Sequence, residues 1–252
     1  MKVMTFNTRT PTPHDGINMF DFRKDRILDV LQREKPDLIG FQELKQEGKD
    51  WLCEALGDEY LFLGVGRDAD LSGEGTPVAV RWDTFSVIGM EQFWLSDTPD
   101  IPGTRYENSD QSSCCRIAVA AKLLHKKSGR VFTFLNTHTD HKGEMARQKG
   151  LLQIEEYLKT CAGEKIVTGD MNATPDSAEI QAFLKAVNPL GVKDCTDTVG
   201  NTFHGYNTTC SIKIDYVFSN MKAVTSHAVE DVPVGGVYYS DHLAVCAELD
   251  FE

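Results

Sequence analysis

The sequence predicts an α/β protein in the form of a four-layer α/β/β/α sandwich, with two mixed sheets packed together and flanked by helices. Two observations favour this fold. A strand, a helix and a second strand follow one another twice along the chain, and the segments around both units are rich in further strands. Polar strand ends also repeat at similar spacing, because Asn7 precedes Glu43 by 36 positions and Asn136 precedes Asp170 by 34. We expect one domain over residues 1–252, a length that can bury one large core.

The first unit starts at the N-terminus. Residues 2–6 alternate in polarity and predict a strand. Residues 21 to 34 carry apolar side chains at helical spacing, and Pro36 ends that helix. The segment DLIGFQE, residues 37–43, then predicts a strand that ends on Glu43.

The second unit repeats this order. VFTFLNTH, residues 131–138, predicts a strand, residues 143 to 160 predict a helix, and KIVTGDMN, residues 165–172, predicts the next strand. Further strands are expected at residues 60–66, 76–82, 85–95, 116–124, 213–219, 222–230 and 242–249. Duplicated units with added antiparallel strands are typical of two sheets, each covered on its outside by helices.

The chain is acidic. It has 26 Lys and Arg against 38 Asp and Glu, which gives a formal net charge of −12. Such a field repels polyanions, so a protein that tracks a nucleic-acid backbone is not favoured. A substrate that carries phosphate needs a local positive charge, and a bound divalent cation would supply one.

Cysteine usage and the absence of long apolar stretches bear on location. Seven cysteines without a C-x-x-C pair indicate neither a disulfide framework nor a zinc ribbon, so reduced thiols are expected. No stretch of signal-peptide or membrane type is present, which favours a cytoplasmic protein without a membrane partner. The oligomeric state is left open.

Polar side chains collect at the predicted strand ends. In α/β proteins ligands bind where the carboxyl ends of strands open, which makes these residues candidates for a site. Each also has an ordinary structural explanation, such as a turn, a loop cap, a helix start or a hydrogen-bonded core histidine. The residues are Asn7, Glu43, Asn136, His138, Asp170 and Asn172.

Two acids near the C-terminus are harder to explain structurally. Asp215 lies inside the strand sequence IDYVF, where burial without a partner would be costly. Asp241 and His242 enter the apolar strand LAVCAEL, and the same reasoning applies to them. These groups must therefore be paired or bind a ligand.

In this order the residues resemble the endonuclease/exonuclease/phosphatase superfamily, the DNase I-like phosphoesterases. The most specific parts are GDMN at residues 169–172 and SDHLAV at residues 240–245, joined by IDYVFS and the QE pair, and the resemblance spans Asn7 to His242. It implies the four-layer fold and an enzyme that hydrolyses phosphate esters by in-line attack of water. It also implies dependence on a divalent metal, Mg²⁺ or Mn²⁺.

The resemblance implies metal ligands in the first half of the chain and at its end. Glu43 corresponds to the main metal carboxylate, with Asn7 and Asp241 nearby. Such ligands suit Mg²⁺, which prefers a few hard oxygen ligands and keeps waters that a substrate phosphate can displace.

The resemblance places the reacting groups in the second half. Asp170 and Asn172 would position the attacking water or the oxygens of the phosphorane. His242, oriented by Asp215, would act as general base or as a charged phosphate binder, since a carboxylate fixes the tautomer and raises the pKa of a histidine.

His138 would hold or protonate an oxygen on the opposite side of the phosphorus. In DNase I-like enzymes this histidine is paired with a glutamate just before a strand, and Glu74 occupies that place in GEGTPVAVR. The alternative for Glu74 is a solvated loop acid.

Two further residues are substrate-binding candidates. Arg116 would contact phosphate, and the alternative is a structural arginine at a strand edge. His204, in NTFHGY, would reach the substrate or cap a loop. The family pattern is incomplete around both, because Lys213 stands where apurinic endonucleases usually carry Arg, and no Thr-Trp follows Arg116 and Ile117.

Two loops, residues 95–113 and 197–213, are expected to frame the pocket. Neither has the clustered basic residues of a nucleic-acid track, so a small phosphomonoester or phosphodiester is favoured over duplex DNA. A DNA or RNA nuclease is the rival enzyme. A non-catalytic binding module on the same fold is the rival of another class, although costly ionisable groups that converge on one site disfavour it.

Overall fold

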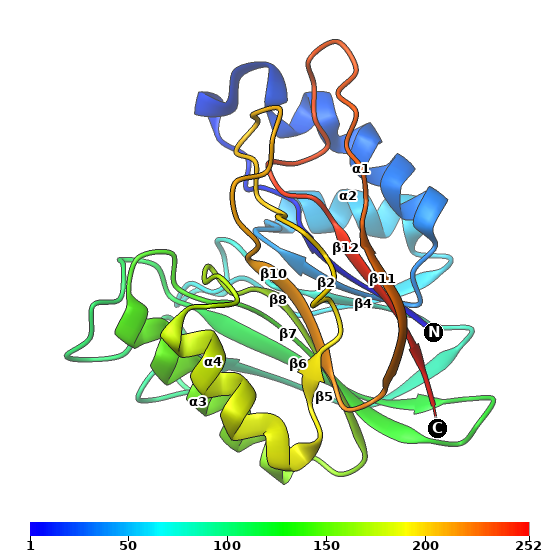
Figure 1. The fold of residues 1–252 in the computed structure, drawn as a ribbon. Coiled ribbons are helices and arrows are strands. Elements are labelled where there is room, and N and C mark those ends of the chain that lie inside the picture. The colour runs from blue at the N-terminus through cyan, green and yellow to red at the C-terminus, as the bar shows by residue number, and fades with distance from the viewer. Residues whose placement is uncertain (252) are drawn as a thin grey trace.

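The structure is a computed structural model that describes residues 1–251. Two six-stranded sheets stack face to face, and α-helices cover their outer faces (Figure 1). The predicted four-layer α/β/β/α sandwich with two mixed sheets is therefore confirmed. The chain termini lie side by side at one end of the sheets, because the first strand pairs with the last.

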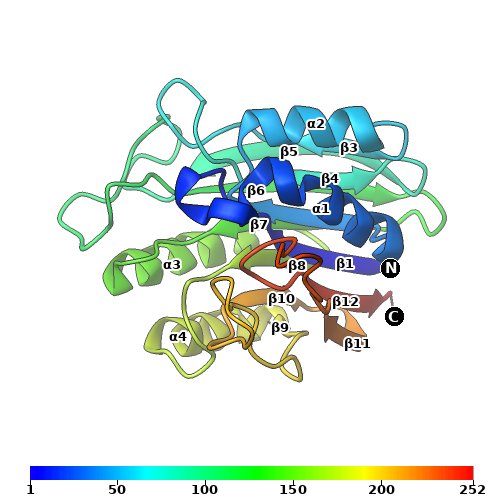
Figure 2. The ribbon, with the colours of Figure 1, turned by 90° about the horizontal axis from the view of Figure 1, so that it is seen from above.

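The first sheet has the strand order β11-β12-β1-β2-β4-β3. The pair β1 and β2 is parallel, and the other neighbours are antiparallel. Its outer face carries the two helices that Figure 2 shows from above. The elements are β1 (Lys2–Asn7), α1 (Phe20–Glu34), β2 (Leu38–Gln42), α2 (Gln46–Leu56), β3 (Tyr60–Leu63), β4 (Val78–Arg81), β11 (Lys222–Ala228) and β12 (Val245–Asp250), with the short 3-10 helix η1 (Pro13–Asn18) before α1.

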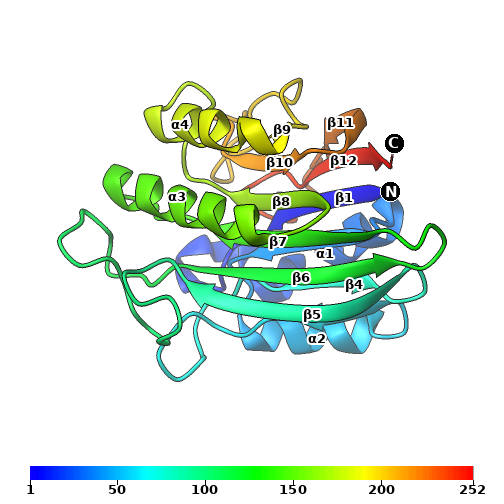
Figure 3. The same cartoon turned by 90° about the horizontal axis from the view of Figure 1, so that it is seen from below.

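The second sheet has the order β5-β6-β7-β8-β10-β9, again with one parallel pair, β7 and β8. Its helices lie on the face that Figure 3 shows from below. The elements are β5 (Phe85–Trp94), β6 (Ile117–His125), β7 (Val131–His138), α3 (Glu144–Thr160), β8 (Glu164–Asp170), α4 (Ala178–Val187), η2 (Asn188–Leu190), β9 (Lys193–Asp194) and β10 (Asp215–Ser219).

Three apolar clusters hold the four layers together. The central one fills the space between the sheets with β-branched and aromatic side chains such as Val3, Val80 and Phe134. The outer two lie between each sheet and its helices, around Ile27 on one side and Ile154 on the other. Burial of this apolar surface is the main stabilising contribution to the fold.

A polar contact crosses the central layer close to the strand ends. The Asn136 amide donates to the backbone carbonyls of Phe41 and Thr76, while its oxygen accepts from Gln42 Nε2 at 2.7 Å and Thr168 Oγ1 at 3.0 Å. Gly40 faces this group, and a Cβ there would collide with the side chains of Asn136 and Thr168. The glycine is required because the two sheets approach closely at this point.

The helices α2 and α4 were not predicted, although both complete the outer layers. In α4 the usual signals are present, since Ser177 caps its first turn by accepting from the Ile180 N–H, but Pro175 favours a longer turn in the sequence. In α2 only Gly48, Leu52 and Leu56 are buried, which is too sparse a stripe to stand out.

Candidate active site

The candidate site is a cavity of about 340 Å³ at the C-terminal ends of β2, β7 and β8. The parallel pairs of both sheets end there, so their polar C-terminal residues meet across the cavity. Eight of the residues expected from the sequence line it together, namely Glu43, Glu74, Arg116, His138, Asp170, Asn172, Asp241 and His242.

Asn7 and Glu43 form the contribution of the first sheet. The Asn7 amide donates to Glu43 Oε1 at 3.1 Å and to Asp170 Oδ2 at 2.9 Å, which links the two sheets. Glu43 follows β2 in the left-handed region at φ +59, and its Oε2 accepts from the Thr10 N–H at 2.8 Å. Burial alone would raise the pKa of Glu43, but that N–H and the charge of His242 lower it, so the carboxylate is ionised.

Buried Arg23 of α1 holds the loops that carry these groups. Its guanidinium donates to the backbone carbonyls of Thr8, Arg9 and Tyr239. An arginine has no acceptor and a rigid fork of donors, so it fixes several carbonyls at once. This clamp sets the positions of the segments that bear Asn7 and Asp241.

Three carboxylates converge on the cavity, those of Glu43, Asp170 and Asp241. Burial and the charge of Glu43 raise the pKa of Asp241, and the nearest cation partner that it has is Arg9, at 3.6 Å. Atoms of Glu43, Asp170 and His138 lie within 4.8 Å of one another. The carboxylate oxygens of this set are hard donors that fit a divalent cation, which would relieve the repulsion between the acids.

Asp215 and His242 are paired, as their sequence context requires. Asp215 of β10 lies opposite Asp170 of β8, which would place two carboxylates side by side. His242 lies between them, with Nδ1 3.0 Å from Asp215 Oδ2 and Nε2 3.7 Å from Asp170 Oδ2. Burial lowers the pKa of His242, but Asp215 and Asp170 outweigh it and raise the pKa to about 10. His242 is therefore an imidazolium at neutral pH.

Asp170 has an unusual protonation equilibrium for an aspartate. Burial and the charge of Asp215 raise its pKa to about 7, against the lowering effects of His242 and of the N–H of Asn172. A carboxyl group with a pKa near the working pH is suited to accept and release a proton.

His138 faces the cavity as a neutral ring. Asn172, in the left-handed region at φ +47, directs its amide to His138 Nε2 at 2.9 Å, so this nitrogen accepts and Nδ1 carries the proton. Burial and the nearby charges of Arg116 and Arg67 place the pKa of His138 well below its usual value.

The expected pairing of Glu74 with His138 is not found among the described residues. Glu74 instead lies 2.6 Å from Arg67, its partner across a short hairpin. The two are also linked through the backbone, by the Arg67 N–H and the Glu74 carbonyl. Sequence reasoning overlooked Arg67, although it stands in the turn-rich segment GVGRDADLSGEG.

The remaining candidates lie in different surroundings. Arg116 precedes β6 and lines the cavity, whereas His204 does not line it. His204 holds the loop 197–213 through its backbone N–H to the Asp241 carbonyl at 2.9 Å, and burial lowers its pKa to about 4.

Of the two loops expected to frame the cavity, only residues 197–213 contribute to its lining, through Phe203 and Ile212. The loop 95–113 does not line the cavity but contacts a residue beside it. Its Ser112 donates to Asp140, next to Arg116. The segment that contains Arg67 and Glu74 takes the place expected for this loop.

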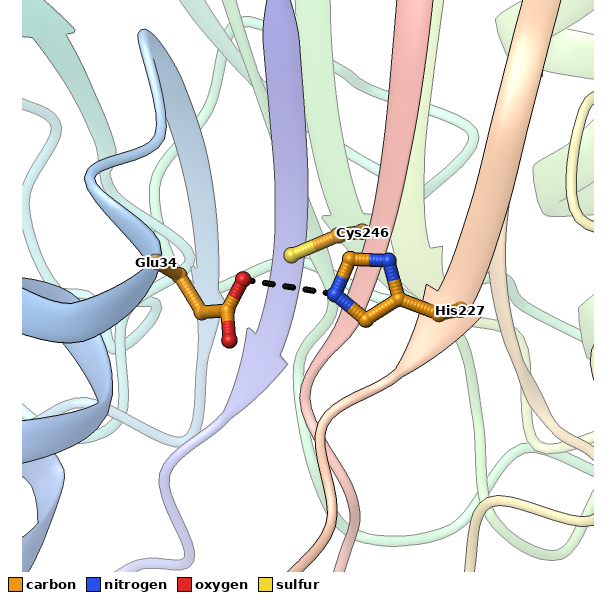
Figure 4. Close-up of side chains that lie close together, drawn as sticks. All are labelled: Glu34, His227 and Cys246. Atoms are coloured by element: carbon orange, nitrogen blue, oxygen red, sulfur yellow. Dashed lines mark hydrogen bonds and ion pairs between the residues drawn. The ribbon is translucent and has the colours of Figure 1, made fainter.

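A second cluster of possible metal ligands lies far from this cavity, where Glu34, His227 and Cys246 meet (Figure 4). Glu34 is already bound to His227 at 3.3 Å and to Lys2 at 3.2 Å. The Cys246 thiol is fully buried, and burial raises its pKa to about 12. Because a metal needs the thiolate and would repel the Lys2 ammonium, the cluster fits an ion-pair network better.

Known proteins resemble the chain over nearly its whole length. Residues 4–242 match the Endonuclease/Exonuclease/phosphatase family. A solved endonuclease/exonuclease/phosphatase from Bacteroides vulgatus is 32% identical with a TM-score of 0.90, covering 100% of this chain and 98% of that one. A mannosyl-6-phosphatase from Bacteroides thetaiotaomicron is 26% identical with a TM-score of 0.88 and covers 100% of both chains. An uncharacterized protein of Acanthamoeba polyphaga mimivirus is 27% identical over 258 residues, 96% of this chain and 87% of that protein.

Within residues 1–251, none of the helices has the length and apolar character needed to cross a membrane.

Proposed function

The chain belongs to the endonuclease/exonuclease/phosphatase family, and on that premise we propose that it is a divalent-metal-dependent phosphoesterase that acts on a small phosphate ester. The observation that carries the proposal is the convergence, in one cavity, of the carboxylates of Glu43, Asp170 and Asp241 with His242, which is paired with Asp215. These groups come from both sheets, and a purely structural role would not require them to meet.

Glu43, Asn7 and Asp241 would hold Mg²⁺ or Mn²⁺, which supplies Lewis-acid stabilisation of charge on the phosphate oxygens. In its present orientation Asn7 directs its amide nitrogen at the two carboxylates. A half-turn of the amide would present its oxygen instead. Glu43 supplies an ionised oxygen ligand because its pKa is lowered.

Asp170 is our candidate for the group that accepts a proton from the attacking water. Its pKa of about 7 suits that exchange near neutral pH. The Asn172 N–H donates to Asp170 Oδ1 at 2.9 Å and leaves Oδ2 directed at the cavity, toward His138 and His242. The water would therefore lie within reach of this oxygen.

His242 and His138 would act on the phosphate from two sides. A charged His242 stabilises the negative charge that develops on the phosphate oxygens, and Asp215 fixes its ring. His138 is neutral, so it would contribute no full charge to the phosphate. This assignment favours the phosphate-binding role of His242 over the general-base role.

The substrate is proposed to be small. The cavity has a volume of about 340 Å³, and Phe203 and Ile212 form an apolar wall against which a leaving group could pack. The net charge of −12 disfavours long nucleic acids. The mannosyl-6-phosphatase among the similar structures is consistent with a phosphorylated metabolite.

The test is a screen of phosphomonoesters and phosphodiesters with Mg²⁺ or Mn²⁺, before and after chelation. Metal-dependent turnover of a small ester supports the proposal. Undiminished turnover after thorough chelation contradicts the proposed metal dependence. If no ester is turned over, a non-catalytic binding module is favoured.

The nuclease alternative is tested with the Asp170→Asn variant, by titrating salt against binding of duplex DNA, single-stranded DNA and a small phosphoester. We expect weak binding of DNA even at low salt. A steep salt dependence with submicromolar duplex affinity would favour a nuclease.

A further inference from the structure

Arg116 is a buried cation with unused hydrogen-bond donors. It is 4% exposed at the cavity wall, and its Nη2 donates to His141 Nδ1 at 2.9 Å. Its Nε and Nη1 have no hydrogen-bond partner among the described residues. Asp140 lies 3.6 Å from Nε, but the oxygens of Asp140 already accept from Ser112 and from the backbone of residues 142–143. Buried donors without a partner are costly, which points to a ligand that completes them.

Arg67 brings a second guanidinium to the same cavity. Its side chain is held by Glu74 at 2.6 Å, and its carbonyl accepts from Trp94 Nε1 at 2.6 Å, so the residue is fixed at both ends. After burial, the charge of Arg67 is the largest influence that lowers the pKa of Arg116. Both guanidinium groups line the same cavity, and like charges there repel each other unless an anion lies between them.

We propose that Arg67, Arg116 and His141 form a subsite for the terminal oxygens of a phosphate monoester, and that this subsite makes the enzyme select monoesters over diesters. The inference rests on the proposed function. His141 contributes a donor because its Nδ1 accepts from Arg116, which leaves the ring proton on Nε2 at the exposed rim.

The chemistry of the donors sets the preference. Guanidinium groups present paired N–H donors and no acceptor, which matches two oxygens of one phosphate. A monoester carries close to two negative charges near neutral pH and three terminal oxygens. A diester has one charge and only two such oxygens, so its second ester group would leave Arg116 donors unmatched.

The experiment compares p-nitrophenyl phosphate with methyl p-nitrophenyl phosphate, two esters that release the same leaving group. We expect Arg67→Met and Arg116→Met each to lower kcat/KM for the monoester by about 10- to 100-fold, the scale of a lost charge-assisted hydrogen bond, and for the diester by less than about 3-fold. Arg116→Lys keeps the charge without the fork and should restore part of the loss. Arg33→Met, on the exposed face of α1, is the matched control and should change neither.

Equal losses for both esters, or a wild-type preference for the diester, would overturn the subsite while leaving the phosphoesterase intact. Binding of inorganic phosphate to the metal-free protein, measured by calorimetry, is the second readout and should weaken by about 10-fold or more in each Met variant. If the wild type hydrolyses neither these esters nor any other ester of the screen, the proposed function fails, and equal phosphate affinity in wild type and variants then overturns the subsite too. Should Arg116→Met not fold, Arg67→Met and Arg116→Lys decide the question.

Discussion

The two strand-helix-strand units, β1-α1-β2 and β7-α3-β8, have sheet neighbours in the same order and orientation, yet their acids behave in opposite ways. Glu43 follows the last strand of the first unit, and its pKa is lowered, because the Thr10 N–H, the charge of His242 and the Asn7 amide together outweigh burial. Asp170 ends the last strand of the second unit, and burial and Asp215 raise its pKa to about 7. In the proposed function, one scaffold would thus provide a charged carboxylate to hold a metal and a second carboxylate to exchange a proton, a separation typical of catalytic acid pairs.

The largest expected effect is on turnover, and the metal dependence of that turnover should distinguish Glu43 from Asp170. Chelation should abolish turnover, and Mg²⁺ or Mn²⁺ should restore it. Glu43→Gln should raise the metal concentration required for half-maximal rate, because it removes a charged ligand. Asp170→Asn should lower kcat by about 10²-fold or more at saturating metal, the scale of a lost acid-base group.

The measurement is a metal titration of the rate for both variants beside the wild type. If Asp170→Asn is fully rescued by added metal, or Glu43→Gln is not, the division of labour between the two units is wrong.

The second prediction concerns the contact between the units. His242→Ala should lower turnover by about 10²-fold or more while the protein stays folded, because it removes the cation between Asp170 and Asp215. Circular dichroism and steady-state kinetics check this. Near-parental turnover in a folded variant would place the chemistry elsewhere.

The third prediction concerns the contribution to stability of the hydrogen bonds that Asn136 makes between the two sheets. In each unit the residue pair that lies two positions before the end of the parallel strands can be compared. This pair is Thr5 and Gly40 in the first unit, and Asn136 and Thr168 in the second. Asn136→Ala should lower the free energy of unfolding by about 2 kcal/mol, because it removes the buried hydrogen bonds of this side chain with Gln42 and Thr168 and with two backbone carbonyls.

Urea unfolding measures this change, and Asn201→Ala, in an exposed loop, is the control, with an expected change below about 0.5 kcal/mol. If Asn136→Ala lowered the free energy of unfolding as little as Asn201→Ala does, the hydrogen bonds of Asn136 between the two sheets would contribute nothing to stability.

The smallest expected effect is a pH dependence of stability from His204. Burial lowers its pKa in the folded protein to about 4, below its usual value, so between pH 6.5 and pH 4 the unfolded chain binds the extra proton. Stability from this group is therefore full above pH 6.5 and is lost as the pH falls.

Between pH 7 and pH 5 the free energy of unfolding should fall by about 1 kcal/mol because of His204, after allowance for solvent screening. Urea midpoints of the wild type and His204→Gln at both pH values measure it. A difference between the two proteins that stays constant with pH would contradict a neutral, buried ring.

The strand framework followed from the sequence because buried strands carry continuous β-branched runs bounded by turns. The helix α4 could not be predicted in the same way, since its apolar face follows a proline and a turn. The helix α2 could not be predicted either, since it buries few apolar side chains and has a glycine among them. Tertiary packing against the sheets, absent from local patterns, stabilises both.

Most of the candidate site was found for a related reason: acids and histidines at strand ends are expensive to bury, so their chemistry is visible in the sequence. The partner of Glu74 was not visible in the sequence, because a local hairpin places Arg67 beside it and the two residues form an ion pair. The unmatched donors of Arg116 are likewise a property of three-dimensional surroundings, not of residue order.

The pairing of β1 with β12 has a practical consequence for protein engineering. The Met1 amine donates to the Leu249 carbonyl at 2.6 Å, before the start of β1, whereas the cavity lies at the C-terminal ends of β2, β7 and β8. A short linker between the termini, with new ends opened in the exposed turn between β6 and β7, would give a circular permutant that keeps both sheets. Fusion partners or surface attachments placed at either terminus would likewise leave the cavity open to substrate.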